Sequence, residues 1–593
     1  MSLIVQKFGG TSVADCEKIS AAARKAIRAQ QQGNRVIVVV SAMGHETDRL
    51  VDLAEQLSDS PPSREMDMLL STGEQVSVAL MAIAIHALGH KAVSLTGAQM
   101  GIKTDSTHTK ARIRSISTER INKLLDEGNI IIAAGFQGID ENFNITTLGR
   151  GGSDTTAVAL AAAVGADVAE IYTDVDGVYT TDPRVLPEAR KVNRISYDEM
   201  LELASLGAGV MHSRSIEFGK KFGVPIQVRS SFSDVPGTLI VGEPESSSRP
   251  VSGAAVIKSE ARISVFGVPD VPGTSLQIFS RIAAKNISVD MIVQNVGEDG
   301  RADISFTVPH NEVKPTLEAV EAVAKELKAE RVTHDLEVAK VSVVGLGMAQ
   351  QTGVANRTFR ALSAEGINIQ VITTSEIKIS VLVDRAQYQK ALRAVHQAFE
   401  LDKTPADAPT NPLTVQSSKR VNPAEVVARL QGMGMEELTI DEISLDQSQA
   451  RATILGIPDE PGVAARIFDE IAGDGIFVDM IVQSIARDGR TALTVTVPRD
   501  KLAPALKVLE KIAASLPGGR VTGSSHIAKL SVSGIGLRSN TGVAIRMFQA
   551  LSEKNINVDL INTSEVRVNM VVEAAKGEAA LEAMKKAFSD VVR

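Results

Sequence analysis

The chain has 593 residues, 44% hydrophobic and 23% charged, a composition that excludes a disordered chain and, at this length, predicts about four globular domains. A net charge of −8, no Trp and 3% aromatic residues give neither the basic surface nor the stacking side chains of nucleic-acid-binding proteins, so we expect no nucleic-acid partner. The single Cys16 cannot form an internal disulfide, which favours the reducing cytoplasm and a small buried role for this residue. There is no export signal and no apolar run of the roughly 20 residues that span a bilayer, so we expect no membrane association.

Residues 1 to about 242 alternate β-branched runs with helical stretches. We expect strands at 36–40, 92–95, 130–134, 170–172 and 226–228, and helices near 15–32, 64–88, 118–127, 153–164 and 198–220. This alternation predicts an α/β domain over residues 1–245, with a mainly parallel sheet between two helical layers. In such sheets, ligands bind beyond the carboxyl ends of the strands. The polar segment 243–250 marks the end of this domain.

The first expected strand runs into Lys7-Phe8-Gly9-Gly10-Thr11-Ser12, just before a helix. Paired glycines let a backbone approach phosphates, a helix start points amide donors at them, and Lys7 supplies a cation. A tight turn alone would also explain the glycines. The next strand ends similarly at Ser41, with Thr47 close by, where a local cap is the alternative.

The strongest motif spans residues 147–156, Thr-Leu-Gly-Arg-Gly-Gly-Ser-Asp-Thr-Thr, ahead of an Ala-rich helix. Arg150 suits a bidentate clamp on a substrate carboxylate. We expect Ser153 or Asp154 to cap the helix, whose free amides bind anions. A flexible loop before a capped helix would explain the glycines but not an Arg held among them.

Two further segments carry polar side chains suited to a ligand. Residues 172–184 follow a buried strand and contain Asp-Gly and Asp-Pro turns, from which Tyr179 could cover a nucleoside and Arg184 could reach phosphates. Arg229 is an alternative second cation. Glu74, which we expect near the start of a helix, suits either the helix dipole or the ammonium group of an amino acid.

The rest of the chain is a duplication. Residues 268–309 and 457–498 are identical at 21 of 42 positions, and 340–383 and 529–572 at 21 of 44. Both comparisons have the same offset of 189 residues, so a block of two modules was copied as a unit. Each module reads βαββα with a last strand to be supplied. We expect the modules at 262–337, 338–400, 449–525 and 526–593.

A strand before each block, at 253–258 and 442–447, is a candidate for the missing edge strand of the later module in that block, a nested order. Between the blocks, segment 401–440 carries Pro405, Pro409, Pro412 and Pro423 and is typical of a semi-rigid linker, with a short helix expected at 424–432.

Each module pair offers groups that suit a free amino acid. A helix start with exposed amides suits an α-carboxylate, and acidic and amide side chains suit an α-ammonium. We expect the two modules of one block to face each other, so the candidate residues are Asp270, Gly273, Asp290, Gln294, Asn368 and Thr374 in the first block and Asp459, Gly462, Asp479, Gln483, Asn557 and Thr563 in the second. Ordinary helix-start and turn chemistry is the alternative.

The motifs Lys7 to Val13, Gly149 to Asp154 and Thr173 to Tyr179 resemble those of aspartate kinases, and the four modules are similar to ACT domains, so the resemblance covers essentially the whole chain. It implies the amino-acid-kinase three-layer sandwich followed by ferredoxin-like βαββαβ modules in two duplicated pairs. It also implies the site residues: for ATP, Lys7, Phe8, Gly9, Gly10, Ser41, Thr173, Asp174, Tyr179 and Arg184; for aspartate, Thr47, Glu74, Arg150 and Ser153; and for catalysis, Lys7, Glu74, Arg150 and Asp154.

The same resemblance implies that ATP with Mg²⁺ phosphorylates L-aspartate to 4-phospho-L-aspartate, the first step of lysine, threonine and methionine biosynthesis. It implies lysine and threonine as effectors and a homodimer through the ACT domains. None of the nine His forms a metal-ligand pattern, so no zinc site is expected. Four ACT modules depart from the two of many aspartate kinases, which leaves open which pair binds which effector. An amino-acid-sensing scaffold with an inactive kinase domain is the alternative, disfavoured by the complete catalytic set.

Overall fold

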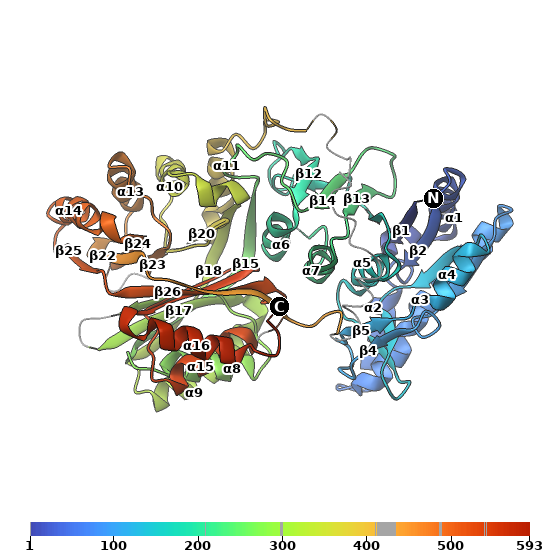
Figure 1. Cartoon of the computed structure of the whole chain (residues 1–593), viewed down its shortest axis with the longest axis horizontal. Coiled ribbons are helices and arrows are strands. Elements are labelled where there is room, and N and C mark those ends of the chain that lie inside the picture. Colours follow the sequence, from blue (N-terminus) through green and yellow to red (C-terminus); the bar gives the residue numbers. More distant parts are fainter. Residues whose placement is uncertain are drawn as a thin grey trace.

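The computed structural model describes residues 2–592 except 208, 297–299, 410, 412–433, 485–488, 539 and 541. The first 242 or so residues form one lobe and the duplicated modules form the other (Figure 1). The kinase-like lobe is built on an eight-stranded sheet in the order β12-β14-β13-β9-β1-β2-β6-β3. Its strands are β1 (Leu3–Phe8), β2 (Arg35–Val40), β3 (Ala92–Leu95), β6 (Ile130–Ala134), β9 (Val168–Thr173), β12 (Arg194–Ser196), β13 (Ile226–Ser230) and β14 (Thr238–Val241).

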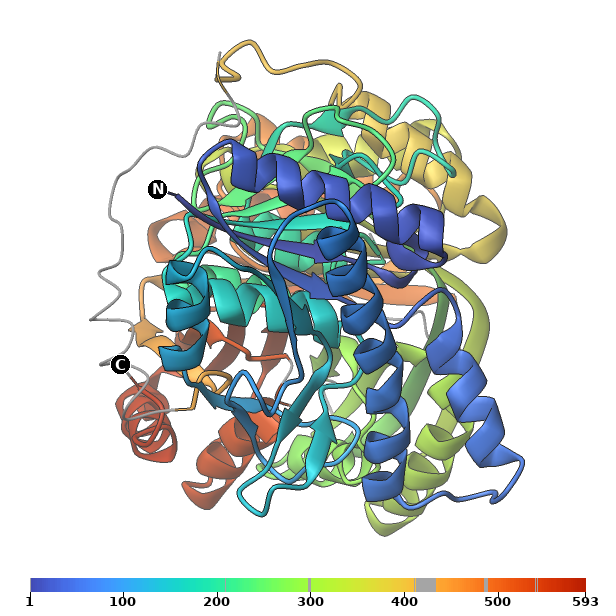
Figure 2. The ribbon, with the colours of Figure 1, turned by 90° about the vertical axis from the view of Figure 1, so that its right-hand side faces the viewer.

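All neighbouring strands of this sheet are parallel except β13 and β14, which confirms the mainly parallel sheet. Alternate side chains of β2 enter opposite cores. Val36, Val38 and Val40 share a core with α1 (Cys16–Gln31) and α3 (Ser63–Ala87). Figure 2, which views the molecule from the side of this lobe, shows the dark blue α1 running over the sheet. Ile37 and Val39 face the other layer, formed by α4 (Glu119–Asp126), α5 (Gly152–Val164), α6 (Tyr197–Ser205) and α7 (Ser213–Phe222). A sheet buried on both faces needs this continuous apolar sequence.

Several sequence expectations for this lobe are corrected. The helix expected at 198–220 is two helices, because the chain breaks between α6 and α7, where Gly207 has a φ of +92°. Helix α2 (Glu46–Glu55), the hairpin β10 (Val178–Tyr179) and β11 (Lys191–Val192), and the small sheet of β4 (Ile102–Thr104), β5 (Ile113–Ile116), β7 (Gln137–Ile139) and β8 (Ile145–Thr147) were not expected. Cys16 is exposed, not buried, because it begins α1.

Contrary to the sequence expectation, helix α3 is long and apolar enough to cross a membrane, but half of its most apolar 18 residues are buried in the protein. It packs along β3, β6 and α1. A helix with one face in a core needs an apolar stripe of this kind.

The other lobe, named the regulatory lobe after the resemblance of its modules to ACT domains, contains four modules with the strand and helix order expected from the sequence. Modules 1 and 2 are built from β15 (Gly253–Pro269), α8 (Thr274–Ala283), β16 (Asp290–Val296), β17 (Arg301–Pro309), α9 (Val313–Glu326), β18 (Arg331–Val344), α10 (Val354–Ala364), β19 (Val371–Thr374), β20 (Lys378–Asp384) and α11 (Tyr388–Ala398). Modules 3 and 4 are built from β21 (Thr439–Asp446), β22 (Gln449–Pro458), α13 (Val463–Gly473), β23 (Ile481–Gln483), β24 (Arg490–Pro498), α14 (Leu502–Ala513), β25 (Arg520–Ser524), β26 (Ile527–Ile535), α15 (Gly542–Glu553), β27 (Leu560–Thr563), β28 (Arg567–Glu573) and α16 (Gly577–Ala587).

The strand pairing is nested. The first part of β15 pairs with the end of β18, with Gly253 opposite Val344, and so adds a strand to module 2, whose helices are α10 and α11. The later part of β15 belongs to module 1, whose helices are α8 and α9. Likewise β21 pairs with β26 and adds a strand to module 4, whose helices are α15 and α16. Module 3, with α13 and α14, lies between β21 and module 4 in the sequence.

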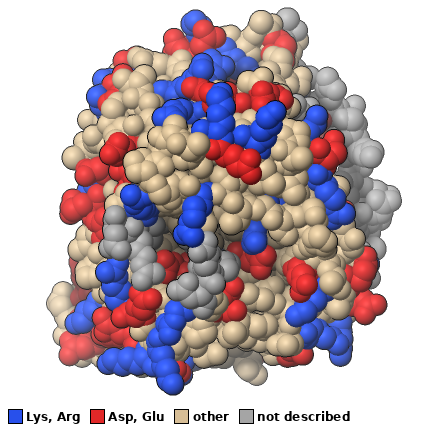
Figure 3. Space-filling view, turned by 90° about the vertical axis from the view of Figure 1, so that its left-hand side faces the viewer, with Lys and Arg blue, Asp and Glu red and all other residues tan. Residues whose placement is uncertain are grey.

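Modules 1, 2 and 3 share one continuous sheet, joined within the first block by β15 and β18, whereas the helices and cores of the modules pair across the two blocks. Strand β19 of module 2 hydrogen-bonds antiparallel to β23 of module 3, so their sheets are continuous. Phe359 and Phe468, with ring centroids 5.0 Å apart, share the core of that pair. Phe279 of module 1 stacks on Phe548 of module 4 at 5.7 Å in a separate core. Figure 3, which views this lobe from its outer side, shows basic and acidic side chains interspersed over the described surface.

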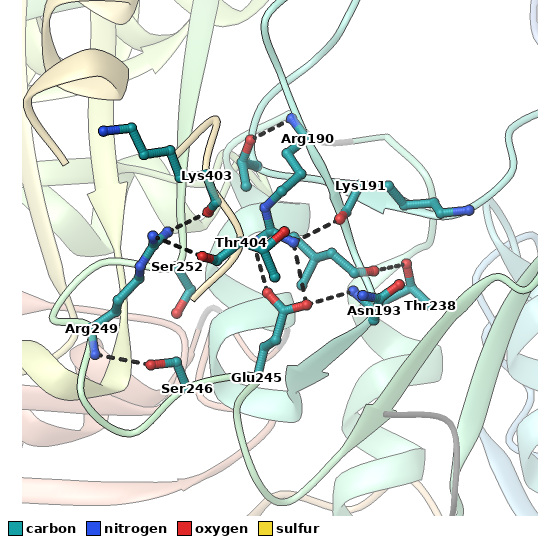
Figure 4. A network of polar contacts seen from close by, with 12 residues as sticks. Arg190, Lys191, Asn193, Thr238, Glu245, Ser246, Arg249, Ser252, Lys403 and Thr404 are labelled. Atoms are coloured by element: carbon teal, nitrogen blue, oxygen red, sulfur yellow. Dashed lines mark hydrogen bonds and ion pairs between the residues drawn. The ribbon is translucent and has the colours of Figure 1, made fainter. Parts of the chain in front are cut away.

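The polar segment 243–250 is a fixed connection between the lobes (Figure 4). Glu245, 6% exposed, accepts hydrogen bonds from Arg190 at 2.6 Å and from the backbone N–H of Asn193 at 3.0 Å. Arg249 donates to the carbonyl of Lys403 at 2.7 Å. The start of the expected linker is therefore held on the end of the kinase-like lobe. Its expected helix at 424–432, with Pro412 and Pro423, lies outside the described residues.

Candidate active site

The site begins where three parallel strands end side by side. Phe8 of β1 lies opposite Val40 of β2 and Tyr172 of β9, so Gly9, Ser41 and Thr173 follow at one edge of the sheet. A Cβ on Gly10 would lie 2.9 Å from the carbonyl oxygen of Ala42, closer than real Cβ atoms come. The tight approach of these two strand ends therefore requires glycine.

Lys7 and Asp154 form an ion pair beneath this turn. The Lys7 Nζ lies 2.6 Å from Asp154 Oδ1, and both side chains are largely buried. Gly151, in the left-handed region with a φ of +68°, precedes α5 and makes no side-chain cap. The expectation that Ser153 or Asp154 caps α5 is therefore wrong: Asp154 lies in the first turn of the helix and points its carboxylate at Lys7, which fixes the ammonium position.

Glu74 lies in the middle of α3, not at its start, and reaches the end of β2. It is 3% exposed and accepts a hydrogen bond from the backbone N–H of Ala42 at 3.1 Å through Oε1. Among the described residues, its Oε2 has no hydrogen-bond partner. Burial raises the pKa of Glu74 to about 8, although the Ala42 bond opposes the shift. A buried carboxyl with one free oxygen is a group prepared for a cationic or hydrogen-donating ligand.

Arg150 lies exposed on the loop between β8 and α5. The neighbouring glycines are tightly packed: a Cβ on Gly149 would lie 2.9 Å from the carbonyl oxygen of Thr109, and one on Gly151 would lie 2.2 Å from the Cβ of His212. Ser153 is buried on the other side of the loop, where a Cβ on Gly135 would collide with its Oγ. The loop is thus held from several sides, while Arg150 remains open to a ligand.

The expected nucleotide residues lie at the same sheet edge but differ in availability. Phe8 is fully buried and stacks on Tyr172 at 4.7 Å, which leaves only its backbone for a nucleotide. The Arg184 side chain is 88% exposed and paired with Asp182 at 2.9 Å, and Arg229 pairs with Glu170 at 2.8 Å. The remaining expected residues follow the ends of β2 and β9. Thr47 is half-buried in the first turn of α2, Thr173 at the end of β9 donates to Asp174, and Tyr179 in β10 donates to Asp176.

The sequence analysis missed several residues that support this site. Asp67, fully buried in α3, accepts hydrogen bonds from Thr147 at 2.6 Å and from the Thr109 backbone at 3.0 Å, and pairs with His108 at 2.6 Å. It thereby ties the loop around residue 109, against which Gly149 packs, to the helix that carries Glu74. An acidic residue seven positions before Glu74 on the same helix face was the available signal.

The expected effector residues meet across blocks. Asn557 donates to Asp270 at 2.8 Å, and Asn368 donates to Asp459 at 2.9 Å. The expectation that Asn368 faces the first module of its own block is therefore wrong. Gln294 and Gln483 donate to the facing modules in the same two pairings, and Gly273 and Gly462 approach Ser552 and Ser363.

Two equivalent cavities lie at these interfaces. One, of about 90 Å³, is lined by Asp290, Arg538 and Thr563 of modules 1 and 4. The other, of about 320 Å³, is lined by Asp479 and Thr374 of modules 3 and 2. Burial alone would raise the pKa of Asp290, but Lys340 and Arg538 hold it well below its usual range.

The family comparisons agree with this architecture. The Amino acid kinase family model matches residues 2–230, and ACT domain models match 261–327, 341–399, 453–512 and 530–588. An aspartate kinase of Stutzerimonas stutzeri is 52% identical over 404 residues, which are 68% of this chain and 98% of the relative. An aspartokinase of Mycolicibacterium smegmatis is 47% identical over 407 residues, 68% of this chain and 97% of the relative.

Solved structures extend the match to the whole chain. The aspartate kinase from Synechocystis is 38% identical, covers 99% of this chain and 98% of that one, and has a TM-score of 0.52. The structure of E. coli aspartokinase III in complex with lysine and aspartate in the T-state is 25% identical, covers 67% of this chain and 99% of that one, and has a TM-score of 0.54. From its kinase site, its ACT modules and these relatives, this chain belongs to the aspartate kinase family.

Proposed function

We propose that the site formed by Lys7, Asp154, Glu74 and Arg150 transfers the γ-phosphoryl group of ATP to the side-chain carboxylate of L-aspartate, the step that commits carbon to lysine, threonine and methionine. The observation that carries this assignment is the buried Lys7–Asp154 pair beneath the Gly9–Gly10 turn, together with the free carboxyl oxygen of Glu74 at the end of the neighbouring strand β2. The pair places a cation where phosphates meet backbone amides, and Glu74 offers the counter-group for an amino acid.

The substrate supplies its own nucleophile. The aspartate side chain is ionised at pH 7, so the protein needs no general base to activate it. The difficulty is repulsion between two anions. In this proposal, the Lys7 ammonium and the amides of Gly9 and Gly10 stabilise charge on the transferring phosphoryl group and its leaving oxygen. Arg150 holds the α-carboxylate and Glu74 the α-ammonium, so the reacting carboxylate is aligned by both.

The residues present fit Mg²⁺ bound together with ATP. Mg²⁺ sites in kinases use one or two carboxylates plus phosphate oxygens, and Asp154 has a second carboxylate oxygen beyond the one paired with Lys7. Asp154 would hold the ion. When bound, Mg²⁺ neutralises phosphate charge.

For regulation, we place effector sites at the module 1–module 4 and module 2–module 3 interfaces, where acidic and amide side chains surround the two cavities. The related E. coli enzyme has been solved with lysine, which supports lysine as one effector. Threonine is proposed as the second from the resemblance to the family. We also propose that the enzyme is a cytoplasmic homodimer joined through its ACT domains, which light scattering of the purified full chain tests.

The test of the activity is an assay of ADP release with ATP and aspartate, glutamate or UMP in turn, without effectors and then with lysine, threonine and both. The proposal requires turnover with aspartate and much less with the other two. Turnover with none of them, together with binding of lysine or threonine, would instead support a sensing scaffold. Activity unaffected by either amino acid would remove the proposed effectors but not the catalytic assignment.

A further inference from the structure

Residues 434–437, which precede β21 of module 4, are part of the kinase lobe in space. Met435 is 1% exposed and lies in the apolar core that contains Ile113 and Leu148. The backbone N–H groups of Met435 and Glu436 donate to the carbonyls of Arg114 at 3.1 Å and Ile113 at 3.2 Å. In Figure 1 this orange segment crosses from the regulatory lobe to the kinase lobe beside β5.

Arg214 of α7 joins this segment to the loop that carries Arg150. Its guanidinium donates to the carbonyl of Leu148, to that of Ala111 at 3.0 Å, and to Glu436 Oε1 at 2.7 Å. The other oxygen of Glu436 accepts the backbone N–H of Ile113 at 2.6 Å. With only 16% of its side chain exposed, Arg214 depends on Glu436 as its counter-charge.

The same segment and Arg150 line one cavity of about 630 Å³. Arg150, Gly149 and His212 line one part of its wall, and Met435, Glu436 and Gly536 line another. Burial and the nearby Arg214 lower the pKa of His212, so the imidazole packed against Gly151 stays neutral near pH 7. Arg214 is then the charged group that fixes the backbone two residues before Arg150.

We propose that Arg214 and Glu436 are positioning residues for aspartate binding: they hold the Leu148–Gly151 loop so that Arg150 meets the substrate, and they make that loop depend on the segment leading into module 4. This inference rests on the clamp role proposed for Arg150. A planar guanidinium bound to three acceptors has one orientation, whereas loss of its carboxylate partner releases the Leu148 carbonyl. A shift of about 1 Å in a positioning group is enough to lower substrate affinity strongly.

The test uses the full chain with Glu436→Ala and Glu436→Gln, with Arg150→Ala measured in parallel. The matched control is Glu437→Ala, because Glu437 is adjacent but pairs with the half-exposed Arg114. We expect Glu436→Ala to raise the aspartate KM about tenfold while kcat and the ATP KM stay within about twofold. Glu436→Gln should be intermediate, since an amide oxygen still accepts from Ile113. Glu437→Ala should match the parent.

An aspartate KM unchanged in Glu436→Ala but raised in Arg150→Ala would refute the positioning role alone. A KM unchanged in Arg150→Ala would refute the clamp proposed for Arg150. A loss spread evenly over kcat and both KM values, with a lower Tm, would show that Glu436 only stabilises the fold and would overturn the inference.

Discussion

In the catalytic lobe, Lys7, Ser41 and Thr173 come together because their strands are parallel neighbours, whereas in the regulatory lobe Asp270 meets Asn557 at a separation of 287 residues, in the other copy of the duplication. The parallel sheet admits one arrangement of strand ends. The duplicated modules admit several pairings, because each copy carries the same interface residues. A sequence motif therefore identifies which residues can form a site, whereas the topology of the fold decides which other residues they contact.

The two blocks of the duplication also differ in one cluster of charged side chains. It is fully buried around Lys340 in the first block and has fewer charged members around Lys529 in the second. In the first block, Lys340 lies between Asp290 at 2.5 Å and Glu260 at 3.1 Å and has no exposed side-chain surface. In the second block, Lys529 pairs with Asp479, and Gln449 stands at the position equivalent to Glu260. Asp290 is further paired with Arg538 at 3.5 Å, which has Ala349 as its counterpart.

The largest expected effect tests this difference. Lys340→Met leaves two buried carboxylates without their shared cation, which should lower the free energy of unfolding by about 3–5 kcal/mol. The matched Lys529→Met removes one partner from a less buried pair and should cost about 1–2 kcal/mol. Thermal denaturation of both variants in the full chain measures the difference. Equal Tm shifts would show that Lys340 and Lys529 contribute equally to the stability of the protein.

The sequence predicted the catalytic lobe well because its signals are local. Apolar runs marked the buried strands, and glycines beside Lys7 and Arg150 marked the strand and loop ends where side chains meet. The break between α6 and α7 was not predicted, because the apolar periodicity of the sequence continues across it. Glu74 was placed near a helix start, although the helix expected at 64–88 already had this residue in its middle; in the structure Gly73 packs against Ala42 within that helix, where a Cβ would lie 2.8 Å away.

The regulatory lobe was predicted only within each module. Strand and helix order followed from periodicity, and the nested edge strands followed from the repeat. The pairing of modules 1 with 4 and 2 with 3 could not be predicted, since Asn368 and Asn557 are identical residues at equivalent positions. Nor could the docking of Met435 on the kinase lobe, because one apolar residue beside a linker carries no periodic signal.

The second largest effect is expected for the Lys7–Asp154 ion pair of the active site. Lys7→Ala should lower kcat by about 10²–10³, equivalent to about 3–4 kcal/mol of transition-state stabilisation, with a small change in the aspartate KM. The reason is that the ammonium faces charge that develops in the transferring group. Steady-state kinetics of the variant measure both constants, with the exposed Lys18→Ala as control. A raised aspartate KM with normal kcat would place Lys7 at the substrate instead.

A smaller effect is expected for Arg150, the exposed residue proposed to bind the substrate carboxylate, and it should change KM more than kcat. Arg150→Ala should raise the aspartate KM about 10–100-fold, since a charge-assisted pair with a carboxylate contributes about 1.5–3 kcal/mol. Its kcat should fall less than that of Lys7→Ala. Kinetics over a wide aspartate range separate the two constants, and Arg28→Ala on the exposed surface of α1 controls for the loss of an exposed guanidinium.

The smallest expected effect is a pH dependence that comes from Glu74. With a pKa of about 8, this carboxyl is mostly protonated at pH 7 in the free enzyme. Binding an ammonium favours the ionised form, so below pH 8 aspartate must displace a proton from Glu74, and its apparent affinity should rise with pH by up to about tenfold between pH 7 and 8.5. Above the pKa the carboxylate is already charged and the gain in aspartate affinity ends.

Calorimetry in buffers of different ionisation enthalpy would detect the released proton. Glu74→Gln should bind aspartate more weakly, with no proton release. A parent enzyme whose aspartate affinity is flat over this range would show that Glu74 does not face the ammonium.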